Sequence, residues 1–150
     1  MTGQTVLANI EPGMRYTFAD PTTAGASLTL TNPVTAETTQ LSLPASGWRA
    51  IEQTSAYRWK YVYVDHGSGP CRRVTLAAGM FKASCTGAGI GFTLDEPAQQ
   101  VLAAVLAVGT AGPRFCVEFG GVVISDRSTA SGSGRFAAKS APRPAACPAT

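Results

Sequence analysis

Apolar and polar residues alternate along several short stretches of the chain, and turn residues separate these stretches. In residues 26–31 two leucines alternate with threonines, and in residues 39–43 two leucines alternate with polar residues. Successive side chains of a β-strand point to opposite faces, so this period predicts a hairpin of two strands whose leucines share one face. Similar patterns predict further strands at residues 5–10, 15–19, 48–52, 72–76, 80–84, 90–94, 115–125 and 135–139, the last but one with a bulge or bend at Gly120-Gly121.

The stretch 70–85 (PCRRVTLAAGMFKASC) holds two β-type runs on either side of Ala77-Ala78-Gly79. Such a loop suits a three-residue hairpin whose last residue is a left-handed glycine. That register gives three opposed pairs: Leu76 with Met80, Val74 with Lys82, and Cys71 with Cys85. Because both thiols then leave the same face of the ladder, we predict a disulfide between them.

The chain contains four cysteines and a single histidine, and these counts limit the roles that the sulfur atoms can have. No CxxC motif is present, so structural zinc is a poor fit, and an even count in a β-patterned chain favours two disulfides. With Cys71 assigned to Cys85, the second pair is Cys116 with Cys147. Two disulfides indicate an oxidising compartment, whereas buried free thiols in a cytosolic protein are the alternative.

Residues 56–65 form the longest alternating stretch, with four aromatic side chains on one face: Tyr57, Trp59, Tyr61 and Tyr63. The opposite face carries Arg58 and Lys60, so the aromatic face is expected to belong to the core. A second interpretation, in which Trp48 joins the four rings, is a stacking platform for sugar rings. A contact with another protein is the third.

Residues 97–108 carry conflicting signals. Asp95 suits a helix N-cap, Pro97 suits a first turn and Gly109 suits a helix end, so the local sequence predicts a helix. The eight apolar residues 101–108 equally suit a strand buried on both faces, as the neighbouring strands favour. The residues alone leave both possibilities open.

Composition places the chain among small globular domains with few ion pairs. The 150 residues are 14% charged, with a net charge of +3 and no basic cluster larger than Arg72-Arg73, which argues against nucleic acid as a partner. No apolar stretch is long enough to span a bilayer. Residues 1–4 lack the regions of a signal peptide, so export would imply a leader already removed. We expect one β-sandwich domain over residues 1–141 and a Pro/Ala tail over residues 142–150, tethered by Cys147.

The sequence offers little catalytic chemistry. His66 lies in a Gly/Ser/Pro loop without a nucleophile elbow, and the carboxylates show no paired arrangement. We therefore expect no catalytic residue and no resident cofactor. Calcium is the least implausible metal, because β domains bind it through loop carboxylates. Four aspartates fall in turns: Asp20, Asp65, Asp95 and Asp126.

Several landmarks occur together in one order: residues 115–121 (FCVEFGG), Asp126, residues 136–139 (FAAK) and residues 141–148 (APRPAACP). With them the chain resembles an uncharacterised β domain of exported proteins from myxobacteria and related bacteria. The likeness covers residues 20–148, and the loop 128–133 is longer than is usual there. The resemblance implies secretion, a β sandwich and disulfides, and it favours a strand at residues 97–108. It implies no reaction.

The overall expectation is an all-β, antiparallel sandwich, jelly-roll or immunoglobulin-like in general appearance, with two disulfides. Its expected function is that of a non-catalytic structural or interaction domain of a secreted or cell-surface bacterial protein, such as a subunit of an extracellular assembly. A protein partner or self-association through an exposed strand edge is expected, with residues 100–108 and 5–10 as candidate edges. The alternative is a carbohydrate-binding module that uses the aromatic residues.

Overall fold

The computed structural model of the protein describes residues 2–3, 6–8, 20–51, 60–67, 69–77, 80–86, 90–91, 94, 99–120, 122–127, 134–141 and 144–147. Most of these residues form β-strands, and all neighbouring strands pair antiparallel. The helices α1 (Pro21–Ala24) and η1 (Ala45–Gly47) are single turns. The predicted all-β, antiparallel class with two disulfides is confirmed.

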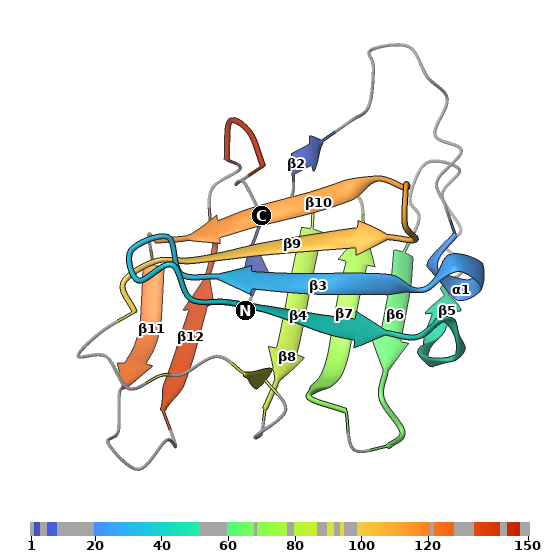
Figure 1. Ribbon diagram of the computed structural model, residues 1–150, viewed down its shortest axis with the longest axis horizontal. Helices are drawn as coiled ribbons and strands as arrows, with labels where there is room; N and C mark the ends of the chain where they lie inside the picture. The colour runs from blue at the N-terminus through green and yellow to red at the C-terminus, as the bar shows by residue number, and fades with distance from the viewer. Residues whose placement is uncertain are drawn as a thin grey trace.

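Two five-stranded sheets lie face to face (Figure 1). The front sheet has the order β2 (Val6–Ala8), β10 (Arg114–Phe119), β9 (Leu102–Val108), β3 (Ala26–Thr31), β4 (Thr38–Leu43). The back sheet has the order β1 (Thr2–Gly3), β8 (Met80–Cys85), β7 (Cys71–Ala77), β6 (Lys60–Val64), β5 (Trp48–Ala50). The front strands run across the back strands, as in crossed sandwiches, and β11 (Val122–Arg127) and β12 (Arg135–Lys139) form a separate hairpin (Figure 1).

The hydrophobic core lies between the two sheets and consists of the inward-facing residues of both. On the front sheet, Leu28 of β3 lies opposite Leu106 of β9, and both are fully buried. On the back sheet, Leu76 of β7 lies opposite Phe81 of β8, and both are 1% exposed. Burial of one such side chain contributes about 1.5–3 kcal/mol. The predicted leucine face is confirmed, because all four residues belong to this core: Leu28, Leu30, Leu41 and Leu43.

The segment with conflicting signals forms the centre of the front sheet. Leu102–Val108 is strand β9, paired with β3 on one side and with β10 on the other. Six of its seven residues are buried, so both of its faces are covered. Tertiary burial therefore outweighs the local helix signals, and the strand interpretation is confirmed for residues 102–108. The same position excludes residues 102–108 as a free edge, so that expectation is wrong, whereas Val6–Ala8 is an edge strand.

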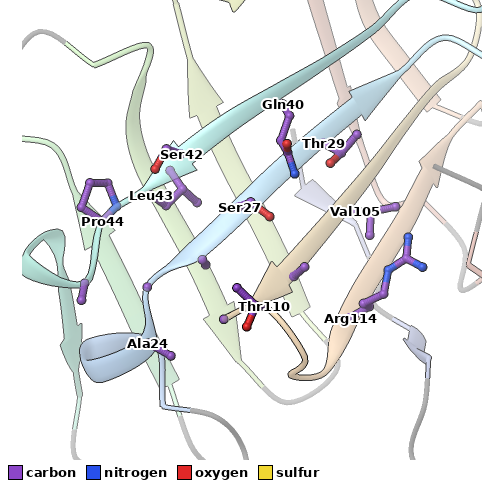
Figure 2. Close-up of a pocket in the computed structure, with 15 residues that line it drawn as sticks. Ala24, Ser27, Thr29, Gln40, Ser42, Leu43, Pro44, Val105, Thr110 and Arg114 are labelled. Carbon is purple, nitrogen blue, oxygen red and sulfur yellow. The ribbon is translucent and has the colours of Figure 1, made fainter.

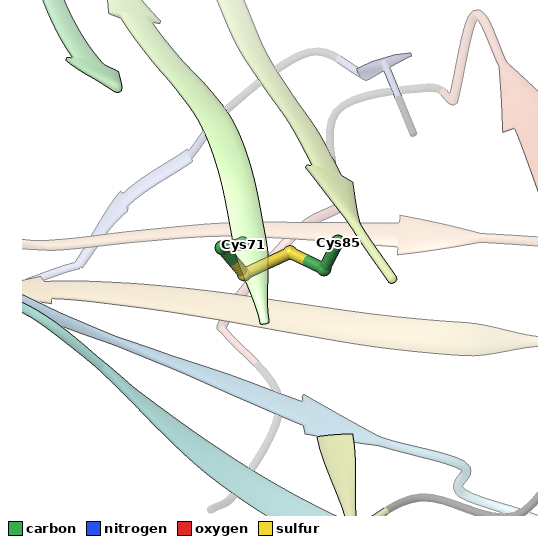
Figure 3. The surroundings of a disulfide bond; sticks show 2 residues. All are labelled: Cys71 and Cys85. Carbon is green, nitrogen blue, oxygen red and sulfur yellow. A yellow bond between two sulfur atoms is a disulfide. The ribbon is translucent and has the colours of Figure 1, made fainter. Parts of the chain in front are cut away.

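The hairpin of β7 and β8 forms as predicted, but its register differs by one residue. Leu76 lies opposite Phe81 instead of Met80, and the ladder regains the predicted Cys71–Cys85 pairing only through a bulge between Cys71 and Arg73. The buried core sets the observed register, because a slip of one residue would move every side chain of the strand to the other face of the sheet. The predicted register would have placed Lys82 beside Val74 on the buried side. The bulge then returns Cys71 to that side (Figure 3).

Two further expectations need correction. The stretch 115–125 is two strands in different sheets, β10 and β11, because the chain leaves the front sheet at Gly120. Ile90 lies in a 3-10 turn, and neither Gly91 nor Leu94 is in a strand. Gly91 has a φ of 52°, which breaks the extended conformation that its alternating neighbours suggest. Residues 15–19 and 56–59 lie outside the described part of the chain.

Candidate functional site

A polar groove lies on the outer face of the front sheet, on the side away from the core. It has a volume of about 710 Å³ and runs over β3, β4 and β9 (Figure 2). The single turns at one end of the sheet border it, and Arg114 of β10 flanks it. The residues that line the groove are Ala24, Gly25, Ala26, Ser27, Thr29, Gln40, Ser42, Leu43, Pro44, Ala45, Val105, Ala107, Gly109, Thr110 and Arg114.

The alternation that builds the core also builds the floor of the groove. Ser27 lies between Ala26 and the inward Leu28, and it opposes Ser42 of β4 and Ala107 of β9. Thr29, the next outward residue of β3, opposes Gln40 and Val105 in the same way. Hydroxyl and amide side chains of two strands therefore stand beside small apolar side chains of a third, which leaves the floor open. The sequence pattern contained these residues, but they resembled an ordinary solvated face.

The end of the groove is held by capping and backbone hydrogen bonds. The Asp20 carboxylate accepts bonds from the Thr22 amide at 2.8 Å and the Thr22 hydroxyl at 2.7 Å, which caps α1. Gly25 follows with a φ of 66°, and its carbonyl accepts a bond from the Gly109 amide at 3.0 Å. A Cβ at Gly25 would lie 3.3 Å from the backbone of Leu43 and Ala45. The turn before β3 is therefore fixed against the end of β4.

The C-terminal tail meets the opposite flank of the groove through a disulfide. Cys116 of β10 points outward, is fully buried, and bonds to Cys147 with an S–S distance of 2.03 Å. Val105, which lines the groove, packs against both cysteines. Both predicted disulfides are thus present, and this one anchors the tail beside the groove. Two disulfides in a β domain of this size fit an extracellular location.

The chemistry of the groove is that of hydrogen bonding with one positive charge. Its lining side chains offer hydroxyl groups at Ser27, Thr29 and Ser42 and an amide at Gln40, all of which donate and accept hydrogen bonds. Arg114 is the charged residue of the lining and is half-buried. These polar groups lie among apolar lining residues such as Leu43, Pro44 and Val105.

None of the described aromatic candidates lines this groove. Trp48 is 6% exposed and donates its indole N–H to the Leu43 carbonyl at 3.2 Å, and Tyr63 is 5% exposed. Their ring centroids are 5.5 Å apart, with the planes tilted by 56°. Tyr61 is half-buried and packs against the core. Tyr57 and Trp59 lie outside the described residues, so only Tyr61 among the described rings presents surface to solvent.

Burial also changes the acidity of these phenols. Desolvation raises the pKa of Tyr61 above its ordinary value, and the negative charge of Asp20 adds to the effect. The pKa of Tyr63 is raised in the same way, first by desolvation and then by Asp65. Both phenols are therefore neutral near pH 7 and serve as core side chains with a polar end.

Three of the four aspartates predicted in turns are described, and each accepts hydrogen bonds from backbone amides, but Asp126 lies in strand β11 and not in a turn. Asp20 caps α1, and Asp65 accepts a bond from the Gly67 amide at 2.9 Å. Asp126 accepts bonds from two consecutive amides, Gln99 at 3.0 Å and Gln100 at 2.8 Å. Asp95 lies outside the described part of the chain. Among the described residues, no three His, Cys, Asp or Glu side chains gather as they would around a metal ion. His66 lies exposed in a bend.

A buried polar cluster near the start of β9 escaped sequence analysis. The Asn32 side-chain amide donates to the Gln99 side-chain oxygen at 2.8 Å, and both residues are buried. The Asn32 oxygen accepts a bond from the Val34 amide at 2.8 Å. These contacts join positions 67 residues apart, and no local pattern announces such a pair. The cluster fixes the β3–β4 loop against the segment that enters β9.

Comparison with protein-family models, with curated proteins and with solved structures gives no match for this chain. None of the helices in the described part of the chain has the length and hydrophobicity needed to cross a membrane. The resemblance to the exported myxobacterial domain therefore stays an expectation from the sequence.

Proposed function

We propose that this chain is a non-catalytic interaction domain of an exported bacterial protein and a subunit of an extracellular assembly. The two disulfides support export, because such bonds persist in oxidising compartments. The rigid sandwich supports a binding role, since a polar groove lies on strands that disulfide and backbone bonds hold in place. In this proposal the surface around the groove contacts a neighbouring protein subunit.

The observation that carries the proposal is the edge of β4 beside the groove, where no further strand of the described part of the chain pairs with it. β4 lies at the end of the front sheet, and Gln40 and Ser42 of this strand also line the groove. Both residues are exposed, as is Thr38 at the start of the strand. A strand edge with unpaired backbone groups is a template for a further strand. The edge would supply affinity, and the groove side chains would supply specificity.

Sedimentation equilibrium of the oxidised chain over a wide concentration range tests this proposal. We expect reversible self-association at high concentration and at moderate ionic strength, because the edge is uncharged and screening by salt should matter little. A protein that stays monomeric at every accessible concentration would count against a subunit of an assembly.

Carbohydrate binding is the second candidate, favoured by the hydroxyl and amide side chains on the groove floor. The burial of Trp48 and Tyr63 weighs against a platform of surface aromatics. A glycan array with the wild-type chain tests this candidate. The informative variant is Thr29→Trp, which fills the groove, and Ser84→Trp on the exposed face of β8 is its control. Glycan binding lost in the first variant and kept in the second would favour the carbohydrate candidate.

A further inference from the structure

We infer that two copies of this chain pair through β4 around a two-fold axis, with Gln40 opposite its counterpart in the second copy. The two front sheets then form one continuous sheet, and the two grooves adjoin. This inference rests on the proposed function. It adds which strand forms the contact, the register in which the strands pair, and that the partner is a second copy of the chain.

The direction of the free backbone groups follows from the β3–β4 ladder. The Asn32 amide donates to the Glu37 carbonyl at 2.9 Å, so this pair is hydrogen-bonded at the closed end of the hairpin. Hydrogen-bonded and non-hydrogen-bonded pairs alternate along an antiparallel ladder. With the observed register, the residues of β4 that turn their N–H and C=O groups away from β3 are Thr38, Gln40 and Ser42.

Only some registers of a second β4 satisfy these groups. In a hydrogen-bonded pair, both residues must point their N–H and C=O groups toward the other strand. In β4 only Thr38, Gln40 and Ser42 do so, and therefore each hydrogen-bonded pair joins two of these even-numbered residues. The register with the longest overlap places Gln40 at the two-fold axis and Thr38 opposite Ser42 of the second copy. It forms about six backbone hydrogen bonds, two for each of three pairs. Pro44, which has no N–H, ends the ladder.

The length of β4 and its uncharged side chains indicate that the strand pairing with it comes from a second copy of the chain. Exposed edges in soluble proteins are protected by shortness, charge, proline or a bulge. The edge strand β5 of the back sheet, by contrast, has three residues and carries the exposed Arg49. β4 has six residues and an unbroken register with β3, and it contains neither a charge nor a proline. In the two-fold pairing its neutral side chains meet neutral side chains, so no charge opposes like charge.

Residues of the same copy already contact the inner face of the strand, so the pairing depends on the backbone groups of the edge. In the same register Thr39 lies opposite Leu41 of the second copy, on the side of the sheet that faces the core. Leu41 is 3% exposed and already belongs to the core. Gly91 approaches Thr39 from another segment, since a Cβ there would lie 3.3 Å from the threonine hydroxyl. The outer side chains of Thr38, Gln40 and Ser42 remain exposed.

Cysteine cross-linking of the oxidised full chain tests the register. Hydrogen-bonded pairs have Cα atoms about 5.5 Å apart, which suits a disulfide. We expect Gln40→Cys to form a covalent dimer under mild oxidation. Ser42→Cys alone should not, because its neighbour across the axis is Thr38. A mixture of Ser42→Cys with Thr38→Cys should again cross-link. Equal cross-linking of Ser42→Cys and Gln40→Cys by themselves would overturn this register.

Charge substitution tests the interface without new thiols. Gln40→Lys places two like charges at the axis, so we expect association at least tenfold weaker than wild type, and the same for Gln40→Glu. Mixing the two variants should restore association as a heterodimer, which a folding defect could not do. Ala50→Lys, on the edge strand β5, is the matched control and should associate like wild type.

The outcomes separate this inference from the proposed function. Association that Gln40→Lys leaves unchanged would overturn pairing through β4 and leave an assembly subunit in place. A wild-type chain that never associates would overturn both. Loss of association with Gln40→Lys, together with rescue in the mixture, would support both.

Discussion

At the scale of single residues, the contact between Gly47 and Tyr63 shows how tightly the core limits one position. A Cβ at Gly47 would collide with the Tyr63 ring, which lies against Trp48. Gly47 therefore leaves room for an aromatic pair at the point where η1 leads into β5. The sequence predicted Tyr63 as a core residue or ligand contact and Trp48 as a ligand contact, but it gave no sign that a glycine beside them was required.

We predict that Gly47→Ala lowers the free energy of unfolding by about 1–3 kcal/mol, the usual cost of overpacking. Urea unfolding followed by tryptophan fluorescence measures this change. Gly67→Ala is the control, because a Cβ there would make an ordinary contact, 3.5 Å from the Asp65 carboxylate. A Gly47→Ala variant as stable as wild type would mean that Tyr63 can move aside.

The raised pKa values of Tyr61 and Tyr63 predict a loss of stability at alkaline pH. Burial keeps these phenols protonated in the folded state, whereas in the unfolded chain they lose their protons near pH 10. The unfolded state therefore binds fewer protons above pH 10, and stability falls as the pH rises through the folded pKa values. Unfolding midpoints at pH 8 and pH 11 should differ less for Tyr63→Phe than for wild type. An equal drop would assign the effect to other groups.

At the scale of elements, strands whose two faces differ were predictable, and strands shaped by distant contacts were not. Residues 26–31 and 135–139 are strands with the predicted bounds, because their alternation needs only one buried face. The register of the β7–β8 hairpin was wrong because the core decides which face is inward. The groove was missed because an outward polar face has the same sequence pattern whether it is flat or bordered by turns.

Asp126 of β11 ties the β11–β12 hairpin to the segment that enters β9. Its carboxylate accepts bonds from the Gln99 and Gln100 amides, and Gln100 has a φ of 56°. We predict that Asp126→Asn lowers stability by about 1–2 kcal/mol, because a charged acceptor is lost at one amide. It should also speed hydrogen exchange at both amides. Asp65→Asn, which removes a half-buried carboxylate elsewhere in the chain, is the control and should leave these two amides unaffected.

At the scale of the whole molecule, one disulfide links two strands of the same sheet and the other links the C-terminal tail to a sheet. Cys71–Cys85 closes a hairpin within the back sheet, over a separation of 14 residues. Cys116–Cys147 ties the tail to the outer face of the front sheet, over 31 residues. The first pairing was predictable from a local hairpin and the second only by elimination. Where the tail lies, beside the groove at Val105, could not be predicted, because it depends on the position of β10 in the sheet.

The two bonds should therefore differ in their contribution to stability. If loop closure dominates, Cys71–Cys85 contributes about 3 kcal/mol and Cys116–Cys147 about 4 kcal/mol. Unfolding of the double variants Cys71→Ala/Cys85→Ala and Cys116→Ala/Cys147→Ala measures both. Wild-type protein, unfolded without reductant, should show no alkylatable thiol, and after reduction it should show four. The variant without Cys116–Cys147 should also release the tail to proteolysis while β9 stays protected at the centre of the front sheet. Loss of that protection would mean that the second disulfide holds the sheet itself rather than the tail.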